Sequence, residues 1–203
     1  MKIICIGRNY VDHINELKNQ RPDSPVIFLK PETSIINKKH PFFIPNFSKD
    51  IQYEVEILVK INRLGKAIST EFSHKYYNHI GLGIDFTARD IQNILKNKGL
   101  PWEKSKAFDG SALIGKWINK SEIPDLKNIN FNLEKNGKIV QVGNTSNMLW
   151  DIDELISEIS KYFTLKIGDI IFTGTPSGVG KVDENDILVG RIGEKECFSI
   201  NIK

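Results

Sequence analysis

The sequence predicts an α+β protein in which β-strands dominate, and two observations support this prediction. Short runs of β-branched and apolar residues recur along the 203 residues, separated by turn-forming residues. Apolar residues follow helical spacing in only two or three stretches. Strands interrupted by a few helices, without regular strand–helix alternation, favour α+β over a parallel α/β fold.

The composition is that of a globular chain with no sign of a nucleic-acid or membrane role. Hydrophobic residues make up 40%, and the formal net charge is +3 with the basic residues scattered, which argues against a nucleic-acid-binding face. No apolar run reaches transmembrane length, and the apolar start is too short for a signal peptide. The two cysteines, Cys5 and Cys197, lie far apart, which indicates a reducing cytoplasm and no disulfide scaffold.

The chain is expected to divide near residue 45. Residues 1–45 would form a small N-terminal lobe with strands over Lys2–Ile6 and Val26–Leu29. An irregular, proline-containing segment closes this lobe. Residues 46–203 would then form the main body.

A short helix is predicted after the first strand, over Val11–Lys18. His13 and Glu16 are three residues apart on it and therefore share one face. Such a pair is commonly a solvated pair on a surface helix. The functional alternative is a histidine base with a carboxylate that orients the ring and raises its basicity.

A predicted strand over Tyr53–Ile61 carries two acidic residues on one face. Side chains alternate between the faces of a strand, so Glu54 and Glu56 lie on the same side, roughly 7 Å apart. Two neighbouring carboxylates repel, and burying either is costly without compensation. The pattern allows three arrangements: an exposed sheet face, a shared proton, or a cation between the carboxylates.

The next predicted strand, Ile80–Ile84, delivers Asp85 at its end. Thr87 is expected to N-cap a helix that runs to about Lys98, with Gly99 as the residue that terminates it. Both features are local signals of where a helix begins and ends.

Three further polar residues allow two interpretations each. Arg89 and Gln92 are three residues apart and share one face of this helix, and Lys106 falls in a loop that mixes aromatic and charged residues. An exposed helix face and a solvated lysine are the simpler interpretations. The alternative is that these side chains line a functional site.

The second half of the chain contains ordinary structural signals. Asn136-Gly137 predicts a type I′ hairpin between two strands. Apolar residues at helical spacing predict an amphipathic helix over Met148–Tyr162 whose apolar stripe belongs to the core. Further strands are predicted over Ile170–Thr173, Ile187–Val189 and Glu196–Ile202.

The glycine-rich run from Gly174 to Gly180 does not match a phosphate-binding P-loop. That motif needs Gly-Lys followed by Ser or Thr, whereas Gly180-Lys181 is followed by Val182. The run can still surround a small anion with backbone N–H groups.

Glu54, Glu56 and Asp85 form an all-oxygen set of three carboxylates if the two strands bring them together. Such ligands suit Mg²⁺, Mn²⁺ or Ca²⁺ far better than Zn²⁺. Three protein ligands on an octahedral ion leave about three positions for water or substrate. The set therefore has the character of a catalytic metal site.

A series of motifs follows in order along the chain and resembles the fumarylacetoacetate hydrolase family. The motifs are Gly7-Arg8-Asn9-Tyr10 with His13 and Glu16, Phe28-Leu29-Lys30-Pro31, Tyr53-Glu54-Val55-Glu56, Asp85-Phe86-Thr87-Ala88-Arg89-Asp90-Ile91-Gln92, Lys106-Ala107-Phe108-Asp109, and the run from Gly168 to Gly180. Each motif alone is weakly specific, whereas the ordered set spans nearly the whole chain.

The resemblance implies a mixed β-roll of packed sheets with a few peripheral helices, assembled as a homodimer. It implies that residues 46–203 form the catalytic core and that the N-terminal lobe carries a mobile lid segment. It also implies individual roles: ligands of Mg²⁺ or Mn²⁺ at Glu54, Glu56 and Asp85, catalytic residues at His13, Glu16 and Lys106, and substrate-binding residues at Arg89, Gln92 and Thr175.

The substrates implied by the resemblance are small 2-oxo acids. The first expectation is hydrolysis of a C–C bond in acylpyruvates through a metal-stabilised pyruvate enolate, with decarboxylation of oxaloacetate as a further activity of the same site. The alternatives are an isomerase or tautomerase of 2-oxo diacids, and a metal-binding homologue without activity. Intact His13, Glu16 and Lys106 argue against the inactive homologue.

Overall fold

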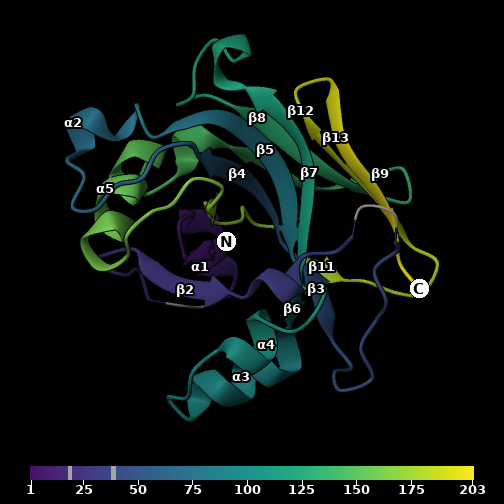
Figure 1. Cartoon of the computed structure of the whole chain (residues 1–203). Coiled ribbons are helices and arrows are strands. Elements are labelled where there is room, and N and C mark those ends of the chain that lie inside the picture. Colours follow the sequence, from purple (N-terminus) through teal and green to yellow (C-terminus); the bar gives the residue numbers. More distant parts are fainter. Residues whose placement is uncertain (18–19, 38–39) are drawn as a thin grey trace.

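The computed structural model describes residues 1–17, 20–37 and 40–203, and a curved six-stranded sheet forms its centre (Figure 1). The strands are, in spatial order, Val26–Lys30 (β2), Ile3–Gly7 (β1), Ile170–Phe172 (β10), Val55–Ile61 (β4), Tyr77–Asp85 (β5) and Ala112–Asn119 (β7). β1 and β10 run parallel, and the other neighbours are antiparallel. The strands are rich in Ile, Leu and Val, which suits a sheet buried on both faces.

A four-stranded antiparallel sheet packs against this central sheet. It consists, in spatial order, of Lys195–Asn201 (β13), Ile187–Ile192 (β12), Asn130–Lys135 (β8) and Lys138–Asn144 (β9). β12 and β13 contact β5, and β8 contacts β4. Ile57, Leu82, Leu133 and Leu188 are fully buried in the cluster that these contacts form, so the core lies between the two sheets.

A third, small sheet borders the end of the central sheet where β4 begins. It is made of Gly180–Lys181 (β11), Ile51–Tyr53 (β3) and Thr87–Ala88 (β6). β3 leads directly into β4, and β6 directly follows β5. The ends of these strands therefore meet at one place in the molecule.

Short helices surround the sheets (Figure 1). They are Val11–Glu16 (α1), Thr70–Ser73 (α2), Arg89–Asn97 (α3), Glu103–Lys106 (α4) and Ile152–Tyr162 (α5), with single 3₁₀ turns at Glu32–Ser34, Lys120–Glu122 and Thr145–Asn147. α2 packs against α5, and α3 against α4. No helix within the described ranges is long and apolar enough to cross a bilayer.

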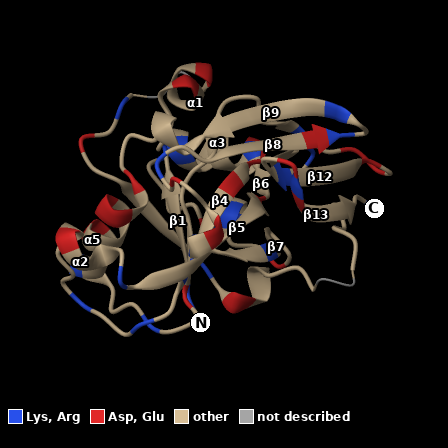
Figure 2. Cartoon of the chain, turned by 90° about the horizontal axis from the view of Figure 1, so that it is seen from above, with Lys and Arg blue, Asp and Glu red and all other residues tan. Residues whose placement is uncertain are grey.

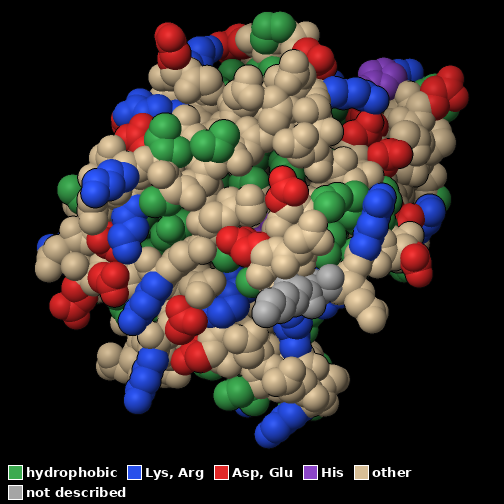
Figure 3. Space-filling view, turned by 180° about the vertical axis from the view of Figure 1, so that it is seen from behind, with side chains coloured by type: hydrophobic (Ala, Val, Ile, Leu, Met, Phe, Trp, Pro, Cys, Tyr) green, Lys and Arg blue, Asp and Glu red, His purple; other side chains and the backbone are tan. Residues whose placement is uncertain are grey.

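Charged residues of both signs are distributed along the chain. Figure 2 shows acidic and basic residues on the outside and also around β4, β5 and β6 in the interior. On the face in Figure 3, acidic, basic and hydrophobic side chains are interspersed. The interior charges are the unusual feature, because ionised groups are rarely buried without partners.

The predicted fold class is confirmed: strands dominate and the helices are peripheral. The hairpin prediction is also confirmed, since Asn136 (φ 54°) and Gly137 (φ 76°) both have the positive φ that a type I′ turn requires. The predicted amphipathic helix begins later than expected, at Ile152. The reason is a capping box, in which Asp151 accepts from the Glu154 N–H and Glu154 accepts from the Asp151 N–H.

Several local predictions were wrong. No strand was predicted where β7 lies. Thr87 is not an N-cap: it pairs in β6, and Ala88 precedes α3 without a side-chain cap. Gly99 does terminate this helix, with φ 63°.

The N-terminal residues form one short helix and two strands of the central sheet. The helix α1 ends at Glu16, and the predicted end at Lys18 lies outside the described residues. β1 and β2 pair with each other, and β1 pairs with β10, so the first residues share a sheet with the rest of the chain. A boundary near residue 45 stays a prediction.

Candidate metal centre and active site

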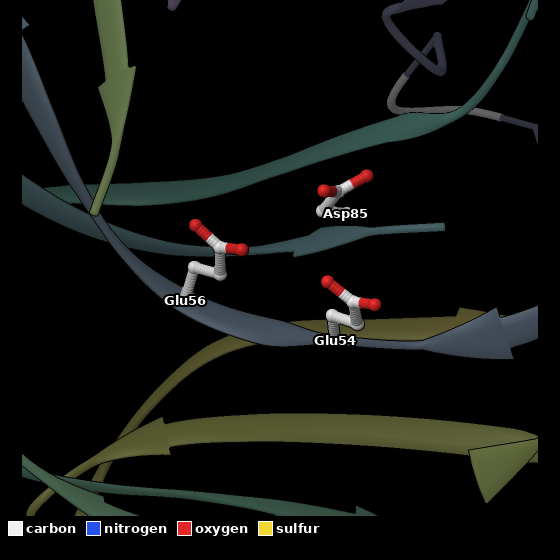
Figure 4. Close-up of side chains that lie close together, drawn as sticks. All are labelled: Glu54, Glu56 and Asp85. Atoms are coloured by element: carbon white, nitrogen blue, oxygen red, sulfur yellow. The ribbon is translucent and has the colours of Figure 1, made fainter. Parts of the chain in front are cut away.

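Three carboxylates meet where β4 begins and β5 ends. β4 and β5 are antiparallel with Val55 opposite Ile84, and the Asp85 N–H donates to the Glu54 carbonyl at 2.9 Å. This register places Asp85 beside Glu54 and Glu56. One oxygen from each of the three lies within 4.8 Å of the others, and all three point into the same space (Figure 4).

All three carboxylates are buried, with exposed fractions of 4% for Glu54, 2% for Glu56 and 0% for Asp85. The exposed sheet face that the sequence allowed is therefore wrong. Burial of this kind requires either protons or positive charges close by. The structure supplies lysine and arginine side chains on two sides of the cluster.

Lys106, the last residue of α4, bridges two of the carboxylates. Its Nζ donates to Glu54 Oε2 at 2.8 Å, Asp85 Oδ2 at 2.7 Å and Thr87 Oγ1 at 2.6 Å. Burial alone would lower the pKa of Lys106, but the charges of Asp85 and Glu54 raise it above its ordinary value. Lys106 is thus a fixed ammonium group, and the solvated loop lysine that the sequence allowed is wrong.

Lys30, the last residue of β2, lies behind Asp85. Its Nζ is 2.7 Å from Asp85 Oδ1, which makes an ion pair. The two atoms do not form a hydrogen bond, and Oδ1 accepts none from any residue in the described part of the chain. The Nζ donates instead to the carbonyls of Lys106 and Ser111 and to Ser111 Oγ. Lys30 therefore links Asp85 to the segment that carries Lys106.

Arg89 holds the other oxygen of Glu54. Its Nη2 donates to Glu54 Oε1, its Nη1 to Gln92 Oε1 at 2.5 Å, and its Nε to Gln52 Oε1 at 2.8 Å. Burial would raise the pKa of Glu54, but Lys106 and Arg89 lower it below its ordinary value. Arg89 and Gln92 are buried, so the exposed helix face that the sequence allowed is wrong.

Glu56 lacks such a partner. It forms no ion pair with any residue that the structure describes, and its Oε2 accepts a hydrogen bond only from the Gly174 N–H, at 2.7 Å. Burial, followed by the charges of Asp85 and Glu54, raises its pKa well above the ordinary carboxyl value. A cation next to Glu56 would remove this penalty.

The turns around Gly174 are fixed by Asn9, which is fully buried. The Asn9 Nδ2 donates to the carbonyls of Thr173 at 2.8 Å and Trp150 at 3.2 Å, and its Oδ1 accepts from the Trp150 N–H at 3.0 Å. Gly174 has φ 102°, and a Cβ there would lie 2.8 Å from the Asn9 Cβ. Only glycine fits this backbone.

The donor set fits a hard divalent cation. Its ligands are carboxylate oxygens from Glu54, Glu56 and Asp85, as Mg²⁺ and Mn²⁺ prefer. Glu56, which has no ion-pair partner in the described part of the chain, would ionise readily only beside such a cation. The geometry of the chain thus supports the metal site that the sequence predicted.

α1 carries a histidine–carboxylate pair over the same space. Glu16 Oε2 lies 3.0 Å from His13 Nδ1, and Glu16 Oε1 accepts from the Gly178 N–H at 2.9 Å. A carboxylate accepts hydrogen bonds, so this contact places the ring proton on Nδ1 and leaves Nε2 as the basic nitrogen. His13 is only 6% exposed, whereas Glu16 is exposed, so the histidine alone departs from a solvated surface pair.

Thr175 follows Gly174, and a hydrogen bond from Gln141 fixes its side chain. Its Oγ1 accepts from Gln141 Nε2 at 2.9 Å, while Gln141 Oε1 accepts from the Val55 N–H at 2.9 Å. The buried Gln141 on β9 thus ties the glycine-rich run to the start of β4. Nothing in its local sequence indicates this role, because β8 and β9 reach the site only through the tertiary fold.

One cavity collects these groups. Its lining comprises Ile6, Gly7, Arg8, His13, Leu17, Phe28, Glu54, Glu56, Asp85, Arg89, Gln92, Lys96, Trp102, Lys106 and Thr175. The open space is about 30 Å³, which admits one or two water-sized groups and no whole organic acid. Substrate binding therefore requires displacement of part of the lining.

The structure brings together every residue that the sequence singled out. Eight of them line the cavity, and Glu16 contacts His13. Their individual roles, and the lid role of α1, stay predictions. Sequence reasoning assigned no role to Gln52 or Gln141, nor to Lys30 and Arg8, although the latter two lie within quoted motifs.

A protein-family profile and curated relatives both match this chain over most of its length. The sequence profile described as fumarylacetoacetate (FAA) hydrolase C-terminal matches residues 2–198. The bovine protein "Oxaloacetate tautomerase FAHD1, mitochondrial" is 41% identical over 184 residues, covering 91% of this chain and 83% of that protein. "Oxaloacetate decarboxylase, mitochondrial" of Dictyostelium discoideum is 42% identical over 188 residues, covering 92% of this chain and 86% of that protein.

Solved structures extend the comparison. Fumarylpyruvate hydrolase from Pseudomonas aeruginosa, in complex with Mn²⁺ and pyruvate, superposes with a TM-score of 0.93 at 30% identity, covering 100% of this chain and 89% of that one. The 5-carboxymethyl-2-hydroxymuconate delta-isomerase from Mycobacterium smegmatis superposes with a TM-score of 0.86 at 31% identity, covering 99% of this chain and 78% of that one.

Proposed function

The chain belongs to the fumarylacetoacetate hydrolase family, and we propose on this premise that it catalyses the keto–enol tautomerisation of oxaloacetate with a divalent metal ion. Its relatives are named enzymes that act on oxaloacetate, fumarylpyruvate and hydroxymuconate. The observation that carries the proposal is one cavity in which three buried carboxylates face a histidine oriented by Glu16.

Glu54, Glu56 and Asp85 would hold the ion, which is Mg²⁺ or Mn²⁺. When bound, the ion would polarise the keto group of a 2-oxo acid and make the neighbouring C–H more acidic. Arg89 donates a hydrogen bond to one oxygen of Glu54, and Lys106 donates one to the other. These residues therefore orient the Glu54 carboxylate before an ion binds.

His13 supplies the acid–base chemistry in this proposal. Its Nε2 takes the proton from C3 of oxaloacetate, the C–H electrons form the C2–C3 double bond, and the ring returns the proton to the oxygen on C2. Glu16 orients the ring through its contact with Nδ1. Lys106 keeps its positive charge and favours the negative charge that develops on that oxygen.

The test follows enol and keto oxaloacetate by ultraviolet absorption, with Mg²⁺, with Mn²⁺ and with EDTA. We expect metal-dependent acceleration that EDTA removes and that Glu56→Gln abolishes together with metal binding. Glu158→Gln on α5 is the matched control, because the Glu158 carboxylate contacts Lys161 and the Tyr162 hydroxyl on the surface and lies outside the cavity lining. A correctly folded, metal-loaded protein without turnover would contradict the proposal.

Acylpyruvate hydrolysis, the first expectation from the sequence, is the second candidate. The Mn²⁺ and pyruvate complex of the fumarylpyruvate hydrolase favours it. His13 would then remove a proton from water attacking the distal carbonyl. Pyruvate released from acetylpyruvate, with the matching acid, would identify hydrolysis, whereas pyruvate and CO₂ from oxaloacetate would identify decarboxylation.

Two further properties belong to this proposal. We propose that the enzyme is a homodimer, as the family resemblance implies, which light scattering on the purified protein tests. We also propose a cytoplasmic location. Cys5 and Cys197 are both buried and unpaired, which agrees with a reducing compartment.

A further inference from the structure

Arg8 is one of two cationic residues of the cavity lining that take no part in the proposed reaction. It follows β1 with φ 61°, a left-handed backbone that bulky residues rarely adopt. The next residue, Asn9, makes three hydrogen bonds to distant segments, which hold the turn in place. Such strain recurs at functional sites.

The Arg8 side chain lines the cavity and forms no hydrogen bond or ion pair with any residue in the described ranges. Arg89 and Lys106 differ, because each donates to at least one of the three carboxylates. A guanidinium group offers several donors in a planar fork that matches a carboxylate. Arg8 is thus available to an incoming anion.

Lys96 is the second cation. It follows Arg89 and Gln92 on α3 at spacings that place all three on one helix face, and all three line the cavity. Burial lowers the pKa of Lys96, the charges of Arg8 and Arg89 lower it further, and Glu54 opposes them. Arg8 and Lys96 therefore repel each other across a shared space, and an anion between them would relieve that repulsion.

The balance of charges around the cavity also favours binding of an anion. Three carboxylates and four cationic side chains, Arg8, Arg89, Lys96 and Lys106, line it. A divalent ion at the carboxylates would add to this positive surplus. A substrate with two carboxylates balances such a site better than one with a single carboxylate.

We propose that Arg8 and Lys96 form an anion subsite that binds the second carboxylate of a dicarboxylic 2-oxo acid. The proposal rests on the proposed function and adds the substrate class: diacids in preference to acylpyruvates with an uncharged end. The first carboxylate and keto group lie at the metal end, and the distal carboxylate lies between β1 and α3. Arg8 and Lys96 determine specificity and take no part in proton transfer.

The first experiment measures binding and needs no turnover. Malate and 2-hydroxybutyrate have the same chain length, and only malate has the second carboxylate. We expect calorimetry on the Mn²⁺-loaded protein to give at least about tenfold tighter binding of malate. Equal affinities, or no binding of malate, would overturn the subsite.

Variants assign the preference to the two residues. Arg8→Gln and Lys96→Gln should remove most of it, while Arg8→Lys and Lys96→Arg should keep part of it because the charge remains. Lys98→Gln is the matched control, since Lys98 is the exposed residue directly after α3 and lies outside the cavity lining. Circular dichroism checks that each variant is folded, and an unchanged preference in both folded Gln variants would contradict the assignment.

Steady-state kinetics with oxaloacetate and acetylpyruvate distinguish failure of the subsite proposal from failure of the proposed function. Arg8→Gln should raise the KM for oxaloacetate about 10- to 100-fold with little change in kcat, and leave kcat/KM for acetylpyruvate nearly unchanged. Equal losses for both substrates would overturn the subsite. No turnover of either substrate by the unaltered enzyme would contradict the proposed function alone, and malate binding would still decide the subsite.

Discussion

Lys30 is a buried charged residue whose contribution to the stability of the protein can be measured. It is only 2% exposed, and its Nζ lies among Asp85 Oδ1, Ser111 Oγ and two carbonyls. Removing one partner of a buried pair leaves the other charge uncompensated. The hydrogen bonds also fix the segment between Lys106 and Ser111.

We therefore expect Lys30→Met to destabilise the protein by about 3 kcal/mol, measured by urea unfolding. Lys98→Met, at the exposed residue that caps the C-terminus of α3, should change stability by less than about 0.5 kcal/mol. Equal effects of the two substitutions would show that the buried ion pair contributes little. Ser111→Ala should cost about 2 kcal/mol, since it removes two hydrogen bonds, one from Lys30 Nζ to Ser111 Oγ and one from Ser111 Oγ to the Lys106 carbonyl.

Glu56 gives a prediction about pH. Its pKa in the ion-free protein is raised by burial and by Asp85 and Glu54, so the folded state binds a proton more tightly than the unfolded state. Stability of the ion-free protein should therefore fall as pH rises from the ordinary carboxyl range toward this raised pKa. Glu54 has a lowered pKa and is ionised in both states over that window, so it adds no opposing slope.

The measurement is unfolding of the EDTA-treated protein across this pH range. Glu56→Gln should remove the decline, and saturating Mn²⁺ should reverse it, because the ion replaces the proton. Calorimetry in buffers of different ionisation enthalpy should also detect proton release on Mn²⁺ binding. A flat stability profile would show that Glu56 does not titrate in this way.

At the scale of elements, the turn after β10 connects two parts of the site. The Gly174 N–H donates to Glu56, and a Cβ at Gly174 would crowd Asn9. Gly168 is a matched control, because its φ of 91° is also positive and nothing lies within 4 Å of its Cβ position. The two positions separate backbone strain from crowding.

Gly174→Ala should therefore destabilise the protein by about 1–3 kcal/mol more than Gly168→Ala. It should also weaken Mn²⁺ binding, since the Glu56 contact moves with the turn, while Gly168→Ala should not. Urea unfolding and calorimetry measure the two effects. Equal losses of stability and of Mn²⁺ affinity in both variants would mean that the positive φ, and not crowding against Asn9, causes the destabilisation.

The helix α1 carries the proposed acid–base pair and no metal ligand. His13→Gln should lower turnover about 10²- to 10⁴-fold and leave Mn²⁺ affinity nearly unchanged. Glu16→Gln should lower kcat by less, because the ring keeps one hydrogen-bonding partner. Parallel losses of turnover and metal affinity in His13→Gln would contradict the division between α1 and the β4–β5 carboxylates.

At the scale of the whole molecule, the carboxylates join the start of β4 to the end of β5 at one end of the large sheet. An ion that binds only the folded state stabilises it by about 2.7 kcal/mol at a hundred times its Kd. For a chain of this size we expect Tm to rise by about 5–10 °C with Mn²⁺ and to fall again with EDTA. Glu56→Gln should show no such shift, and an equal shift in that variant would place the ion elsewhere.

The sequence by itself determined the strand-rich class, the Asn136-Gly137 hairpin and the candidate site residues. These follow from local chemistry: turn types demand particular residues, and strand alternation puts Glu54 and Glu56 on one face. The ordered motifs added the family and the dyad of His13 and Glu16.

Tertiary structure alone decided which of the alternatives held. Whether two glutamates on a strand face water or a cation depends on what covers that face, and Lys30, Arg89 and Lys106 come from three other segments. The same reason explains why Gln141 and Arg8 were missed. Charges and hydrogen-bond partners brought together over long sequence separations leave no local pattern, because packing between the sheets, and not residue spacing, sets their distances.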